Sequence, residues 1–70
     1  MFFNKNVKYL CLKNNTSQTV LATLLNTSKQ SLNSILNKNN PTARIIINIS
    51  KVFNVSIDDL LLKDLSSFEE

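Results

Sequence analysis

The sequence predicts an all-α protein, a compact bundle of five short helices in a single domain over residues 1–70. Apolar residues recur at spacings of three and four, and no segment shows the alternation expected of a β-strand. The chain contains no Gly, so turns must fall to Asn and to the single Pro. With 43% hydrophobic residues, the composition suits a packed core joined by loops of about two to six residues.

The first helix is expected to end near Asn14 and Asn15. Its apolar residues follow the spacing i, i+3 and i+4, and they are Val7, Leu10 and Cys11. Ahead of it, residues 1–3 are a candidate for a short strand paired with another terminal segment. Cys11 is the only cysteine and cannot form an internal disulfide, so we interpret it as a small buried packing residue.

The next two helices are separated by a turn of only three to four residues. Ser17 can cap the first of them and Ser28 the second. Asn26 falls in the turn, at a position that requires a positive φ, which Asn tolerates better than other non-glycine residues. The residues expected to face inward are Leu21, Ala22 and Leu25 in the first helix, and Leu32 and Ile35 in the second.

Two further helices are expected after residues 37–40, which are interpreted as a loop. Asn40 and Pro41 have the pattern of an N-cap followed by proline at the first helical position. The inward residues of the fourth helix are Ile46, Ile49, Ser50 and Phe53. A fifth helix, extending to about Leu62, opens with a capping box and a hydrophobic staple, formed by Ser56 with Asp59 and by Val55 with Leu60.

Charge is distributed unevenly along the chain. Residues 1–57 carry seven basic side chains and no acidic one, whereas residues 58–70 carry Lys63 and all five acids, for a net charge of +3. A body without carboxylates attracts polyanions. Charge alone therefore leaves two alternatives, a nucleic-acid partner or an ordinary basic surface.

Several function classes lack the residues that they need. There is no His, so Cys11 has no base beside it, and no carboxylates are spread through the fold to act in pairs or bind metal. We therefore expect no enzymatic activity, no cofactor, no metal and no small-molecule ligand. The longest apolar run is only four residues, at residues 9–12, which excludes a membrane span and a signal peptide. A single cysteine fits the reducing cytoplasm.

The segment at residues 28–36 has a polar outer face on which every side chain can hydrogen-bond and one is cationic. Such a face suits the major groove of DNA, where base edges present donors and acceptors between flanking phosphates. The residues of this face are Ser28, Lys29, Gln30, Asn33 and Ser34.

Over about Asn6 to Leu61 the sequence resembles the phage-repressor/Cro helix-turn-helix family, which is lambda-repressor-like and of the xenobiotic-response-element type. The matching residues are Ser17-Gln18, Leu21-Ala22, Leu25 to Ser28, Leu32, Ile35, Asn40 to Thr42, and Phe53 to Leu60. The chain departs from the family pattern at Asn26, where glycine is usual, and at Leu36, where many members have Glu. It also departs at Val20 and Leu24, where members are usually polar.

The resemblance implies a sequence-specific DNA-binding transcriptional regulator of a bacterium or phage, with its recognition helix at about residues 28–36 and repression as the simplest output. The implied base contacts are Lys29, Gln30, Asn33 and Ser34. The implied phosphate contacts are Gln18, Ser28, Lys38, Asn39, Asn40 and Arg44. Arg44 could instead pair with an acid of the C-terminal segment.

The resemblance also implies a homodimer on a pseudo-palindromic operator, because one recognition helix reads only a few base pairs. The apolar residues of the C-terminal part exceed what a short final helix can bury, which predicts the dimer interface there. These residues are Val55, Ile57, Leu61, Leu62, Leu65 and Phe68. In the alternative arrangement, Leu65 and Phe68 fold back on the core.

A second functional class remains open, an antitoxin-like or other protein-interaction module that reuses the same fold. Val20, Leu24 and Leu36 would contact the partner chain. The simpler interpretation of these residues is that a small domain tolerates some apolar side chains on its surface.

Overall fold

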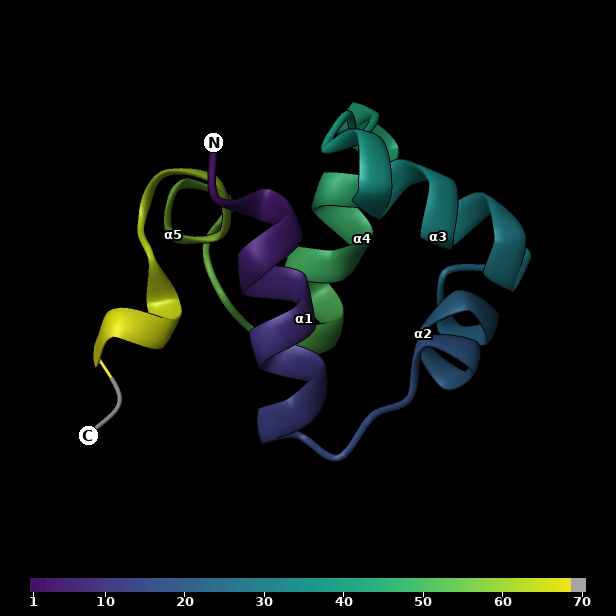
Figure 1. The fold of residues 1–70 in the computed structure, drawn as a ribbon, viewed down its shortest axis with the longest axis horizontal. Helices are drawn as coiled ribbons and strands as arrows, with labels where there is room; N and C mark the ends of the chain where they lie inside the picture. Colours follow the sequence, from purple (N-terminus) through teal and green to yellow (C-terminus); the bar gives the residue numbers. More distant parts are fainter. Residues whose placement is uncertain (69–70) are drawn as a thin grey trace.

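The computed structural model describes residues 1–68 and is all-helical, which confirms the predicted five-helix fold (Figure 1). The elements are α1 (Phe3–Lys13), α2 (Gln18–Leu24), α3 (Lys29–Lys38), α4 (Ala43–Phe53), α5 (Ile57–Leu62) and the 3-10 helix η1 (Leu65–Phe68). In Figure 1, α2 and α3 lie at one end of the molecule and α5 with η1 at the other, with α1 and α4 between them. No helix of residues 1–68 has the length and apolarity needed to cross a membrane.

Four of the five helices begin at a hydroxyl residue. In each case the side-chain oxygen accepts the backbone N–H three residues further on, which satisfies a donor that the first turn leaves without a partner. The pairs are Ser17 with Val20, Ser28 with Ser31, Thr42 with Ile45 and Ser56 with Asp59, at 3.1, 3.0, 3.3 and 3.1 Å. The predicted caps Ser17, Ser28 and Ser56 are confirmed.

The ends of the first four helices are made by asparagine. Asn15, Asn26, Asn39 and Asn54 have φ between 51° and 57°. This left-handed conformation usually belongs to glycine, and Asn is the residue that replaces glycine at the lowest cost. The prediction that asparagines mark the turns is confirmed.

Three local predictions are wrong. Residues 37–40 are not all loop, because α3 continues through Lys38 and ends on Asn39. Asn40 does not cap α4: the N-cap is Thr42, whose hydroxyl is placed to accept an N–H of the first turn. Residues 1–3 form no strand, since Phe3 already belongs to α1, although the N–H of Phe2 does donate to the carbonyl of Leu61 at 2.9 Å.

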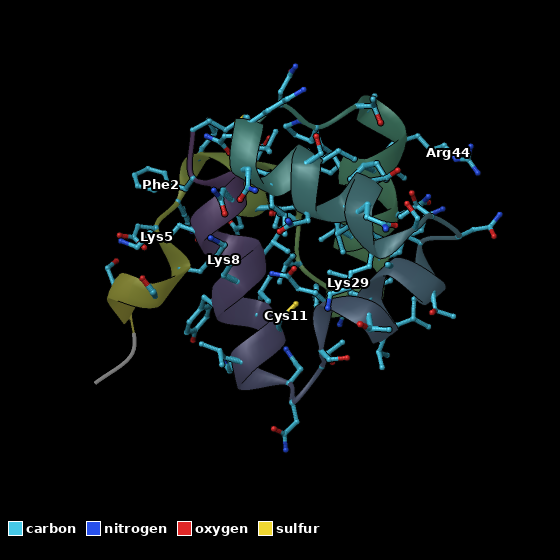
Figure 2. All side chains as sticks on the ribbon, turned by 45° about the vertical axis from the view of Figure 1, so that its right-hand side comes forward. Phe2, Lys5, Lys8, Cys11, Lys29 and Arg44 are labelled. Carbon is cyan, nitrogen blue, oxygen red and sulfur yellow. The ribbon has the colours of Figure 1, made fainter. Side chains whose placement is uncertain are left out.

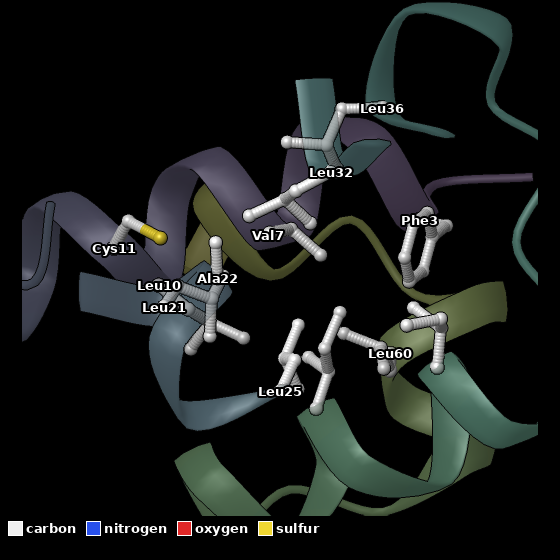
Figure 3. Packing of buried hydrophobic residues seen from close by; sticks show 12 residues of the cluster. Phe3, Val7, Leu10, Cys11, Leu21, Ala22, Leu25, Leu32, Leu36 and Leu60 are labelled. Atoms are coloured by element: carbon white, nitrogen blue, oxygen red, sulfur yellow. The ribbon is translucent and has the colours of Figure 1, made fainter. Parts of the chain in front are cut away.

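The core is a single cluster of apolar side chains contributed by all five α-helices (Figure 3). Its buried members are Phe3, Val7, Leu10, Cys11, Leu21, Ala22, Leu25, Leu32, Leu36, Ile45, Ile49 and Leu60. The predicted inner face of α2 and the burial of Cys11 are confirmed.

The inner faces of α3 and α4 are rotated relative to the prediction. Leu36 is only 1% exposed, whereas Ile35, which was expected to be the inward residue, is only partly buried. The surface role predicted for Leu36 is therefore wrong. In α4, Ile45 and Ile49 are the buried pair, while Ile46 is partly buried.

Asn6 is the one buried polar residue among those described, and its amide holds the end of α5. Its Nδ2 donates to the carbonyls of Leu60 at 2.7 Å and Lys63 at 2.6 Å. Its Oδ1 accepts the N–H of Leu65 at 3.0 Å. One side chain of α1 therefore satisfies backbone groups that the short helix α5 and the start of η1 leave without partners.

Replacing Asn6 by Ala is expected to lower the free energy of unfolding by about 2–4 kcal/mol, because several buried backbone groups lose their partners together. Urea denaturation of the variant measures this loss. Asn40→Ala removes an exposed amide and is the matched control, with an expected change below about 0.5 kcal/mol. Equal effects of the two substitutions would contradict the role assigned to Asn6.

Leu36→Ala is expected to destabilise the protein by about 2–5 kcal/mol, because it removes a buried side chain and leaves a cavity beside α1. Leu24→Ala is the control, since Leu24 is 58% exposed and its truncation should cost less than about 0.5 kcal/mol. Thermal unfolding of both variants checks the orientation of α3. Similar melting temperatures would mean that Leu36 does not face the core.

Candidate nucleic-acid interface

Helix α3 is held against the bundle by one side and leaves the other side open. Leu32 and Leu36, one helical turn apart, are both fully buried and pack into the common cluster. The opposite side of the helix therefore faces solvent. All four residues predicted to contact bases are exposed. Gln30 and Ser34 lie opposite Leu32, Asn33 lies at the side of the helix, and Lys29 is the first residue of α3.

The turn before α3 is closed by backbone hydrogen bonds. Asn26 adopts φ 57°, and the N–H of Thr27 donates to the carbonyl of Ala22 at 2.9 Å. Ala22 is also buried, so its methyl group lets the backbones of α2 and α3 approach closely. These features orient α3 relative to α2 without any contribution from the exposed polar side chains.

Residues at the start of α2 and α3 and beyond the end of α3 were predicted to contact phosphates. Gln18, the first residue of α2, is half-buried. Ser28 is exposed, and its hydroxyl both accepts the N–H of Ser31 and donates to the hydroxyl of Ser31 at 2.9 Å. Lys38 and Asn40 are exposed at and after the end of α3.

Arg44 is exposed in the first turn of α4, and Figure 2 shows its side chain extending away from the bundle. Within residues 1–68 it makes no ion pair with any acid. Its guanidinium is therefore open to an external anion as far as the described part of the chain is concerned.

Asn39 differs from the other predicted phosphate contacts because its side chain has internal partners. Its Oδ1 accepts the backbone N–H of Asn4 at 3.1 Å, and its Nδ2 donates to the carbonyl of Met1 at 3.2 Å. A phosphate contact from this amide would compete with both bonds. The amide thus ties the end of α3 to the beginning of α1.

Asn37 is a further residue of the exposed face, beyond the segment predicted as the recognition helix. It lies seven positions after Gln30 and four after Asn33, so it shares their side of α3, and it is exposed. The predicted loop at residues 37–40 excludes Asn37 from the helix, whereas α3 continues through Lys38. The i+7 spacing would have identified it if α3 had been predicted at its full length.

The acidic side chains of the described residues are remote from this face. Asp58, Asp59 and Asp64 lie in or after α5, at the opposite end of the molecule from α2 and α3 (Figure 1). Asp64 is paired with Lys5 at 2.7 Å. Hydrogen bonds from Lys5 and Ser66 hold the pKa of the Asp64 carboxyl below its ordinary value. The surroundings of α3 therefore keep a positive potential.

The residues predicted for the dimer interface fall into two groups. Ile57 and Leu62 are exposed, at 40% and 71%. The partly buried group packs against the core and consists of Val55, Leu61 and Leu65. Leu65 thus follows the alternative arrangement, in which it folds back, and the side chain of Phe68 lies outside the described part of the structure.

Residues 1–68 were also compared with the requirements of a metal site and of a nucleophilic thiol. No group of three or more His, Cys, Asp or Glu is placed to hold a metal ion there. Burial raises the pKa of the Cys11 thiol, so it stays protonated at neutral pH and is a poor nucleophile.

A short turn between two helices, with the second presenting an exposed polar face next to basic side chains, defines a DNA-binding helix-turn-helix protein. Residues 7–60 match the helix-turn-helix family model, and the chain belongs to this family, which is of the XRE type and Cro/C1-like. Its members are DNA-binding regulatory domains. No curated protein and no solved structure matches the chain.

Proposed function

We propose that this protein is a sequence-specific transcriptional regulator that acts in the cytoplasm and represses by occupying its operator. The supporting observation is the division of α3 into a buried apolar side and an exposed polar side. Uncharged hydrogen-bonding side chains on a rigid helix suit the reading of base edges. A protein that coated DNA non-specifically would need mainly cations on this face.

The two kinds of contact are assigned to different parts of the surface. Gln30 and Ser34 lie opposite Leu32 on α3 and face outward, so they are the proposed readers of bases, with Lys29, Asn33 and Asn37 beside them. Lys38 and Arg44 flank this face and contact phosphates. When it is bound at an operator, the protein excludes polymerase. The degree of repression then depends on the concentration of the protein.

Gln30→Ala is expected to cost about 1–3 kcal/mol of binding free energy on the selected operator and to relax preference at one or two base pairs. Lys38→Ala is expected to weaken binding to all duplexes alike and to lower the salt slope by about one unit. Selection of bound duplexes from a random pool supplies the operator, and gel shifts at several salt concentrations compare the variants. A selection that returns no consensus, or two variants that behave identically across sequences, would contradict the assignment.

We further propose that the protein binds as a homodimer through the edge that carries α5. Ile57 and Leu62 supply exposed apolar surface on this edge. A dimer that holds its two recognition helices about 34 Å apart would place them in successive major grooves on one side of the duplex. A twofold pair would recognise a pseudo-palindromic operator.

The double substitution Ile57→Ser with Leu62→Ser is expected to shift the protein from dimer to monomer, because it removes apolar area from the proposed interface. Sedimentation equilibrium at micromolar concentration measures the oligomeric state of each variant. Leu12→Ser is the control, because Leu12 is 83% exposed on α1 and should leave the dimer intact. A wild-type protein that stays monomeric with and without operator DNA would remove the dimer from the proposal.

An antitoxin-like role remains a second candidate because Val20 and Leu24 are exposed one turn apart on α2. Leu36 is buried and cannot contact a partner chain. Val20→Ser with Leu24→Ser is the discriminating variant. Loss of a co-purifying protein with unchanged DNA binding would favour this candidate.

A further inference from the structure

An open hollow of about 430 Å³ lies where the beginning of α1 meets the end of α3. It is separate from the exposed face of α3 described above. Its lining residues are Met1, Phe2, Asn4, Lys5, Lys8 and Asn39. The Asn39 amide connects the end of α3 to the beginning of α1 at this corner through its bonds to Met1 and Asn4.

The two lysines of the hollow are not equivalent. Lys5 is neutralised by Asp64, whose carboxylate lies 2.7 Å from its ammonium group. Lys8 is exposed and makes no ion pair within residues 1–68. Among the side chains of the hollow, Lys8 therefore carries the unpaired positive charge.

The hollow also contains an unsatisfied polar group. The side-chain oxygen of Asn4 is buried and has no hydrogen-bond partner in the described structure. That oxygen has no exposed surface, so the group of this side chain that can donate a hydrogen bond to an anion is the amide nitrogen, Nδ2.

The position of the hollow favours a DNA phosphate as its anion. Asn39 follows directly on Lys38, so the hollow continues the flank of α3 on which we place phosphate contacts. Figure 2 shows Lys8 and Lys29 on the same side of the molecule. A duplex lying along α3 would therefore bring its sugar–phosphate backbone near Lys8.

We propose that this hollow binds a backbone phosphate of the DNA duplex, with Lys8 supplying the positive charge and the Asn4 amide a hydrogen bond. The inference rests on the proposed DNA-binding function and extends its footprint from α3 onto α1. The sequence-based assignment included no residue of α1. A phosphate contact fixes the register of the protein on the duplex without reading sequence.

Lys8→Ala tests the proposal in the full chain. We expect binding to weaken about five- to tenfold at 0.1 M salt, equally on the selected operator and on random duplexes, and the salt slope to fall by about one unit. Lys8→Arg should restore most of the affinity because it keeps the cation. Lys51→Ala removes an exposed lysine at the end of α4, outside the hollow, and should change binding less than twofold.

Asn4→Asp gives a second test, because it places a negative charge in the hollow while its backbone N–H remains available to Asn39. We expect binding to weaken at least as much as in Lys8→Ala. Thermal unfolding shows whether each variant keeps its fold. If the wild type binds no duplex, the proposed function and this inference both fail. If it binds and Lys8→Ala behaves like Lys51→Ala, only the phosphate site is overturned.

Discussion

The burial of Leu32 and Leu36 is the constraint on which the rest of the structure depends. Both side chains lie on one side of α3, and both are completely enclosed by the core. A helix that buries one stripe must expose the opposite stripe, so the outward position of Gln30 and Ser34 follows from packing and not from any contact of their own. The surface proposed to read DNA is in this sense a product of the core. Its polar side chains are free to suit a binding partner because they contribute little to stability.

Asparagine performs several of the structural tasks in a chain without glycine. Asn26 and Asn54 end helices by taking the left-handed conformation. Asn6 is buried, and its amide forms hydrogen bonds with backbone groups around the end of α5. Asn39 does both, because it ends α3 and also bonds to the beginning of α1. The high asparagine content therefore reflects more than a polar surface, because the amides of Asn6 and Asn39 connect different parts of the bundle.

The charges are sorted between the two ends of the molecule. The described acids lie in or after α5, and Asp64 and Asp59 pair with Lys5 and Lys63. The opposite end keeps its cations without any carboxylate beside them, so the long-range field and the polar face of α3 favour the same partner. Lys8 extends this unpaired surface onto α1, while the carboxylate beside Lys5 cancels its charge locally.

The local features of the fold were determined by the sequence itself. Ser17 and Ser28 cap helices, and Asn26 turns the chain, through contacts within three or four residues, and such contacts depend little on the remainder of the protein. The family assignment rests on the same spacings. Only the tertiary structure decided that Leu36 is buried and that Asn39 bonds to Met1 and Asn4, because these outcomes depend on the other helices of the bundle. Periodicity identifies an apolar stripe, but its neighbours in space determine where that stripe ends.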